Sequence, residues 1–153
     1  MKELTRSGGP IRILNVVDEF TRVSLGSHVA GSIGAREVGR HLERLFAVHG
    51  RPELIRSDNG REFIAATIVA WLFGQKVETA FIEKRSPQQN PYIERFNGTM
   101  RDELLNGEVF DNLLEARVVI DAWNVEYNTV RPHRGLRMLT PAEFARRWKE
   151  GGA

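Results

Sequence analysis

The fold of this chain is decided by the stretch Ile55-Arg56-Ser57-Asp58-Asn59-Gly60, in which an apolar segment runs into an acid and a turn. Residues 52–57 predict a short strand, so Asp58 stands at the carboxyl end of that strand. Ser-Asp-Asn-Gly is also a common turn composition, and taken alone it favours a plain turn. The interpretation of Asp58 as a functional acid therefore depends on a second acid further along the chain.

That second acid, Glu94, comes after thirty-five intervening residues and lies on a helix predicted over residues 90–105. The buried face of this helix is predicted from its apolar stripe, which consists of Ile93, Phe96, Met100 and Leu104. Glu94, Asn97 and Arg101 share a neighbouring face because they are spaced by three and four residues. A carboxylate there can bind a divalent cation together with Asp58, and the amide and guanidinium can bind phosphates. An ordinary solvated face with Glu–Arg pairs is the alternative.

The remaining segments predict a mixed α/β layer fold. Apolar or alternating runs predict further strands over residues 11–17, 23–30 and 76–82. Helical spacing of apolar residues predicts helices over residues 34–49, 62–73, 113–128 and 141–148. Thr140 begins a Thr-Pro-Ala-Glu capping box with proline at the first helical position, so the last helix has a defined start. Residues 83–89 and 131–139 are polar and predict loops.

The composition is that of an ordinary domain of 153 residues, large enough to bury a core, with 41% hydrophobic and 27% charged residues. The absence of cysteine excludes disulfides and thiolate metal sites and fits the cytoplasm, and no apolar run approaches membrane-spanning length. The net charge is +2, and the excess of basic residues lies near the C-terminus. The basic residues there are Arg131, Arg134, Arg137, Arg146, Arg147 and Lys149. Such a segment suits a polyanion, and a solvated helix face is the alternative.

Taken together, the motifs resemble the integrase-type catalytic core of insertion-sequence transposases, which is related to retroviral integrases. The resemblance covers residues 11–148 and rests on the order of LNVVDEFTR (14–22), SDNGREF (57–63), NPYIERFNG (90–98), RDE (101–103), YNTVRPH (127–133) and LTPAEF (139–144). It implies an α/β fold with a ribonuclease-H-like mixed sheet flanked by helices. Residues 11–129 would form the catalytic core, and residues 130–153 a basic C-terminal loop and helix of the same domain.

The resemblance also implies a site. The family uses an Asp, Asp, Glu triad that binds two Mg²⁺ or Mn²⁺ ions, with Asp58 as the second acid and Glu94 as the third. The ions would activate a water or a DNA 3′-hydroxyl for in-line attack on a phosphodiester, so cleavage and strand transfer are the same displacement. The candidate DNA-binding residues are Asn90, Asn97, Arg101, Arg131 and Arg134. The implied partners are DNA, at element ends and target, and a homo-oligomer or full-length transposase.

The first acid of the triad has no counterpart in this sequence. Residues 1–10 contain Glu3 as their only acid, so we expect a disordered or residual segment there and a missing first strand. Asp18 follows an apolar strand, but its distance of 39 intervening residues from Asp58 is short for the first pair, and capping of a hairpin turn is the favoured role. Without one carboxylate the ions would be under-coordinated, which predicts little or no strand transfer by this chain alone.

Three functions therefore stay open. The first is a transposase or integrase catalytic domain, truncated and impaired in this chain. The second is a non-catalytic remnant that binds DNA or a transposase through the basic C-terminal part. The third is a metal-dependent nuclease of the same fold, which the motifs at 127–133 and 139–144 disfavour. The missing acid favours the second function over the first for the isolated chain.

Overall fold

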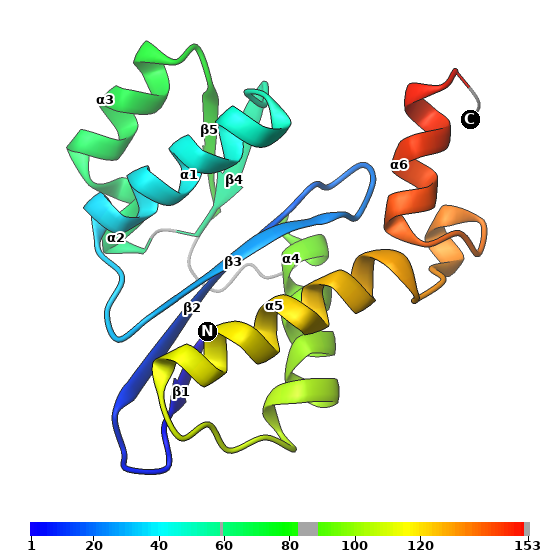
Figure 1. Cartoon of the computed structure of the whole chain (residues 1–153). Helices are drawn as coiled ribbons and strands as arrows, with labels where there is room; N and C mark the ends of the chain where they lie inside the picture. Colours follow the sequence, from blue (N-terminus) through cyan, green and yellow to red (C-terminus); the bar gives the residue numbers. More distant parts are fainter. Residues whose placement is uncertain (59, 83–88, 152–153) are drawn as a thin grey trace. The chain divides into compact units, whose positions relative to one another are not determined.

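The computed structural model describes residues 1–58, 60–82 and 89–151, and the order of its elements can be followed in Figure 1. The chain groups into two compact units. The first unit combines Met1–Gly31 with Arg95–Ala153, and the second unit is Ser32–Glu94. No helix in the described part of the chain combines the length and the apolar character that crossing a membrane requires.

The first unit contains an antiparallel sheet with the strand order β1-β2-β3. Its strands are β1 (Lys2–Leu4), β2 (Pro10–Val17) and β3 (Ser24–Ala30). In β2 every second residue faces the core, so Ile11 and Ile13 are buried and Asn15 follows them on the same face. Ile13 pairs with Val29, and the register shifts between Val16 and Val17. The hairpin predicted from residues 11–17 and 23–30 is confirmed.

Strand β1 lies in the segment that the sequence predicted to be disordered or residual. Lys2 pairs with Arg12 and Leu4 with Pro10, and the following turn is closed by a hydrogen bond from the Thr5 N–H to the Gly9 carbonyl at 2.8 Å. A three-residue strand without an aspartate is therefore present in the segment that we expected to be disordered or residual. No apolar pattern indicates this strand, because β1 is largely exposed at one side of its sheet and forms by pairing with β2.

Helices of the first unit pack on this sheet. Helix α5 (Leu113–Thr129) contacts β3, and α6 (Pro141–Lys149) contacts α5. The core includes an aromatic group: the ring centroids of Phe96 and Tyr127 are 4.8 Å apart and those of Phe96 and Trp123 are 5.4 Å apart. The capping box predicted for the last helix is present, since the Glu143 N–H donates to the Thr140 hydroxyl at 3.2 Å.

The predicted helix over 90–105 has two parts. Helix α4 (Pro91–Met100) continues into a π-helical turn, η2 (Arg101–Leu105), in which the Asn106 N–H donates to the carbonyl of Arg101 at 2.9 Å. A short 3₁₀ turn, η3 (Arg134–Leu136), interrupts the predicted loop before α6. π turns are rare and often occur at functional sites, which draws attention to Arg101.

The second unit places a parallel strand pair beside helices. Strands β4 (Leu54–Ser57) and β5 (Glu78–Phe81) pair in register, with Ser57 opposite Phe81. Helix α1 (Ala35–His49) ends at Gly50, whose φ of +86° favours glycine. The predicted helix over 62–73 is broken into α2 (Arg61–Ile64) and α3 (Ala66–Gly74), because Ala65 has extended backbone angles. Most of the predicted loop over 83–89 lies outside the described residues.

Candidate functional site

Asp58 directly follows β4, as predicted, and its side chain is exposed. One carboxylate oxygen, Oδ1, accepts a hydrogen bond from the Gly60 N–H at 2.9 Å. A Cβ atom on Gly60 would lie 2.9 Å from that oxygen and 2.9 Å from Oε1 of Glu62. The turn thus holds two carboxylates around a glycine, and no ion pair of Asp58 occurs among the described residues.

Glu94 lies in the first turn of α4 and is exposed. Its N–H donates to the Asn90 carbonyl at 3.3 Å, so Asn90 stands at the position that precedes the helix. A carboxylate in the first turn is favoured by the unpaired N–H groups of the helix start. The Glu94 carboxylate has no ion pair among the described residues, and it remains available to a cation.

Asp58 and Glu94 both belong to the second unit. Within residues 1–58, 60–82 and 89–151, no group of three or more histidine, aspartate or glutamate side chains could hold a metal ion. Asp18 is engaged elsewhere: its Oδ1 accepts from the N–H groups of Phe20 and Thr21 and from the Thr21 hydroxyl, at 2.6–3.0 Å. The structure thus gives Asp18 the favoured role, which is to cap the β2–β3 turn.

Asn97, a predicted DNA contact, is half-buried and takes part in a polar network of the first unit. Its Oδ1 accepts from Nδ2 of Asn15 at 2.8 Å, and Oδ1 of Asn15 accepts from the Ser27 hydroxyl at 2.6 Å. Asn124 donates to Ser27 at 2.8 Å and accepts from the Ser24 hydroxyl at 2.8 Å. The network therefore joins β2, β3, α4 and α5.

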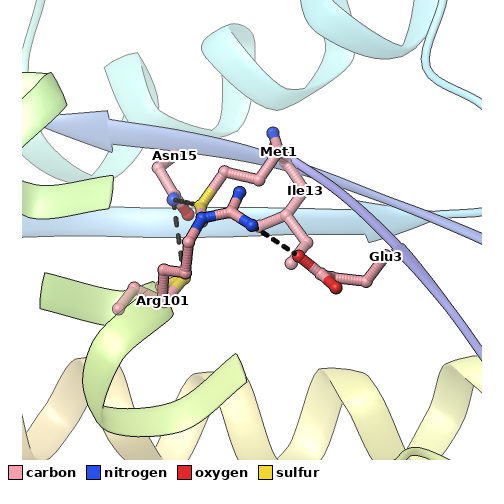
Figure 2. A network of polar contacts seen from close by, with 6 residues as sticks. Met1, Glu3, Ile13, Asn15 and Arg101 are labelled. Atoms are coloured by element: carbon pink, nitrogen blue, oxygen red, sulfur yellow. Dashed lines mark hydrogen bonds and ion pairs between the residues drawn. The ribbon is translucent and has the colours of Figure 1, made fainter. Parts of the chain in front are cut away.

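Arg101 points toward the N-terminal strand, as Figure 2 shows. Its Nη1 lies 3.4 Å from Oε1 of Glu3, in an ion pair whose side chains are 49% and 24% exposed. In the same view the Asn15 amide is directed at the sulfur of Met1, 3.4 Å away. An exposed ion pair of this kind stabilises weakly, so a phosphate can compete with Glu3 for the guanidinium.

The basic segment before α6 contains the last two predicted DNA contacts. Arg131 is half-exposed and forms an ion pair with Glu103, whereas Arg134 is exposed at the start of η3. His133 lies between them, with its ring 4.9 Å from that of Tyr127. Burial, and then the positive charges of arginines led by Arg131, lower the pKa of His133 below its usual value.

Sequence reasoning missed three features of these sites: Glu62 beside Asp58, Glu3 beside Arg101, and the polar network around Asn15. One signal was available for the network, because Asn15 interrupts an apolar strand at an inward-facing position. Glu62 and Glu3 carried no signal, since a partly exposed glutamate is common anywhere on a protein surface.

Two family models, each described as an integrase core domain, match this chain, one over residues 2–87 and the other over residues 75–141. An uncharacterized protein of insertion element IS407 from Burkholderia multivorans is 40% identical over 91% of this chain and 50% of the relative. The transposase for insertion sequence element IS904 from Lactococcus lactis is 29% identical over 84% of this chain and 52% of the relative. The chain thus spans about half the length of these relatives.

Two retroviral integrase structures share this fold. The catalytic core domain of HTLV-2 integrase in complex with magnesium has a TM-score of 0.73 at 15% identity, over 94% of this chain and 90% of the other. The catalytic core domain of BIV integrase has a TM-score of 0.72 at 18% identity, over 99% of this chain and 93% of the other. The predicted α/β, integrase-like fold is confirmed.

Proposed function

Because this chain belongs to the integrase core domain family, we propose that it is the core of a transposase that cleaves and transfers DNA strands with a divalent metal. The observation that carries the proposal is the placement of Asp58 after β4 and Glu94 in the first turn of α4. Both are exposed acids without a cationic partner among the described residues. The relatives from insertion elements support the same conclusion.

The donor chemistry of these residues fits Mg²⁺ or Mn²⁺. Both ions prefer carboxylate oxygens, and the Asp58 turn leaves Oδ2 and part of Oδ1 open while Gly60 holds the side chain in place. We propose that Asp58 and Glu94 are ligands, with Glu62 close enough to the turn to adjust the local charge. When bound, the ion would polarise the scissile phosphate and acidify the attacking hydroxyl.

The other residues would position DNA. Arg101 and Arg134 present exposed guanidinium groups, which bind phosphate oxygens in a planar, two-pronged geometry. Arg131 would exchange Glu103 for a phosphate. Asn97 would act mainly by fixing α4 to β2 through Asn15, and Asn90 by holding the start of α4. We further propose that the chain acts in the cytoplasm on DNA, as part of a homo-oligomer or together with a longer transposase.

Two carboxylates do not complete the coordination of two hard cations. We therefore expect little or no strand transfer from this chain alone. The second candidate function is binding without catalysis, as a remnant that occupies DNA or joins a transposase. The observation that favours it is that Oδ1 of Asp18 already accepts three hydrogen bonds within its own turn.

Calorimetric titration of Mn²⁺ and Mg²⁺ into the full chain tests the metal site. We expect binding that is lost or at least tenfold weaker in Asp58→Asn and in Glu94→Gln, and that is retained in Asp18→Asn. Asp121→Asn, an exposed acid on α5, is the matched control. No binding in the unmodified chain would remove the catalytic proposal for this chain and leave the binding function.

A further inference from the structure

Three aromatic rings come together at the tip of the β2–β3 hairpin and on α6. The ring centroid of Phe20 lies 4.7 Å from that of Trp148, in an edge-to-face arrangement, and 5.6 Å from that of Phe144. We refer to Phe20, Phe144 and Trp148 as the aromatic cluster. All three residues belong to the first unit, although the hairpin and the helix are far apart in the sequence.

The aromatic cluster leaves much of its surface open. Phe20 is 51% exposed and Trp148 is 52% exposed, whereas Trp123, in the core of the same unit, is 9% exposed. Rings that only held α6 against the hairpin would be expected to bury most of their surface, because aromatic burial is the main source of such stability. About half of the surface of Phe20 and of Trp148 is thus available to a ligand.

Basic and acidic residues both lie near the aromatic cluster, and they differ in the partners that they have. Arg147 and Lys149 flank Trp148 on α6, are exposed, and form no ion pair among the described residues. The acids of this region already have partners. Glu143 accepts from Thr140 at 2.9 Å, Glu150 pairs with Arg146 at 2.9 Å, Asp18 caps the hairpin turn, and Glu19 also has an interaction. Arg147 and Lys149 are therefore the charged groups of this region that an anionic ligand can engage.

We propose that the aromatic cluster, with Arg147 and Lys149, is a binding site for unpaired DNA bases. Open aromatic rings stack on base faces, and adjacent cations neutralise the backbone, which is the combination that single strands require. A duplex hides its base faces, so the rings would contribute little to duplex binding. The inference rests on the proposed function, because it assumes that the chain meets DNA whose strands are being opened.

The test measures the affinity of the full chain for a labelled thymidine oligonucleotide and for a duplex of equal length, by fluorescence anisotropy. Trp148→Leu keeps an apolar side chain but removes the stacking surface, so single-strand affinity should fall about tenfold while duplex affinity changes less than about twofold. Trp148→Phe should retain most of the affinity. Trp71→Phe, in the second unit, is the matched control and should bind as the unmodified chain does.

Two further readouts separate stacking from other causes. Tryptophan fluorescence should be quenched by the single strand in the unmodified chain and much less in Trp148→Phe. Arg147→Gln should weaken both ligands and reduce the slope of log affinity against log salt by about one, as expected for one phosphate contact. Circular dichroism of each variant shows whether α6 remains folded. If Trp148→Leu unfolds α6, the affinities of Trp148→Phe and Phe20→Leu are compared instead.

Equal losses for single strand and duplex, or no loss for either, would overturn the proposal. Self-association that Trp148→Leu abolishes would overturn it as well, because the rings would then form a contact between copies of the chain. The calorimetric metal titration keeps the two proposals apart. Metal binding without single-strand stacking would remove only the aromatic site, and stacking without metal binding would remove only the catalytic function of this chain.

Discussion

Replacing Asn15 by alanine should destabilise the first unit, because Asn15 joins β2 to both β3 and α4. The side chain is 9% exposed, donates to Oδ1 of Asn97 at 2.8 Å and accepts from the Ser27 hydroxyl at 2.6 Å. The variant leaves the Ser27 proton without its acceptor and Asn97 without its donor. A buried polar group that loses its partner costs about 1–3 kcal/mol. Since Asn97 and Ser27 are half-buried, the expected loss is about 2–3 kcal/mol in total.

Urea denaturation followed by tryptophan fluorescence measures this loss. Trp123 reports on the first unit, so the experiment is done in a background with Trp71→Phe and Trp148→Phe, where Trp123 is the sole tryptophan. Asn97→Ala removes one bond from a half-buried position and should cost about 1 kcal/mol. The double variant should lose less than the sum of the two single losses, with a coupling of about 1 kcal/mol. A loss below about 0.5 kcal/mol for Asn15→Ala would refute the reasoning, because it lies within the range of neutral surface substitutions.

Three other outcomes are expected from the structure. Thr140→Ala removes the cap of α6 and should cost about 0.5–2 kcal/mol in urea denaturation, with Thr129→Ala as a control whose hydroxyl bonds only within its own helix. Gly50→Ala should cost about 1 kcal/mol, since its φ of +86° is unfavourable for alanine although a Cβ would meet nothing within 4 Å. Burial and nearby arginines lower the pKa of His133, so the unfolded chain binds this proton more readily and stability should fall as pH drops through about 6.5. In His133→Asn the thermal unfolding midpoint should change less between pH 7 and pH 5 than it does in the unmodified chain. An equal change of the midpoint with pH in both proteins would show that His133 is not its cause.

Most helices and strands could be predicted from sequence because their signals are local. The spacing of Val38 and Leu42, the glycine after α1 and the capping box at Thr140 act within one or two turns. Strand β1, the break at Ala65 and the π turn could not be predicted in this way. They depend on pairing and packing with distant residues, and no proline or glycine lies within β1, at Ala65 or within the π turn to indicate them.

The residues of the candidate site also differ in whether local sequence signals could predict their surroundings. Asp58 and Glu94 were identifiable because a strand end and a helix start place acids at the surface. The partners that engage the other candidates were not, since Glu3 and Asn15 lie more than eighty residues from the side chains that they contact. Asn97 illustrates the result: its helix face was predicted correctly, yet its nearest polar partner is another side chain of the protein.

The division of the first unit into two separate stretches has a consequence for the order in which the protein forms during synthesis. The bond from the Ser24 N–H to Oδ1 of Asn128 spans 104 residues, and at ribosomal speed its second half appears roughly 5–20 s after the first. During that interval β3, which includes the buried Val29, has no α5 to pack against. The second unit, which is one continuous stretch, has all its residues available earlier. A nascent chain should therefore protect residues 32–94 from proteolysis before it protects the hairpin, and the hairpin is the segment most exposed to chaperones.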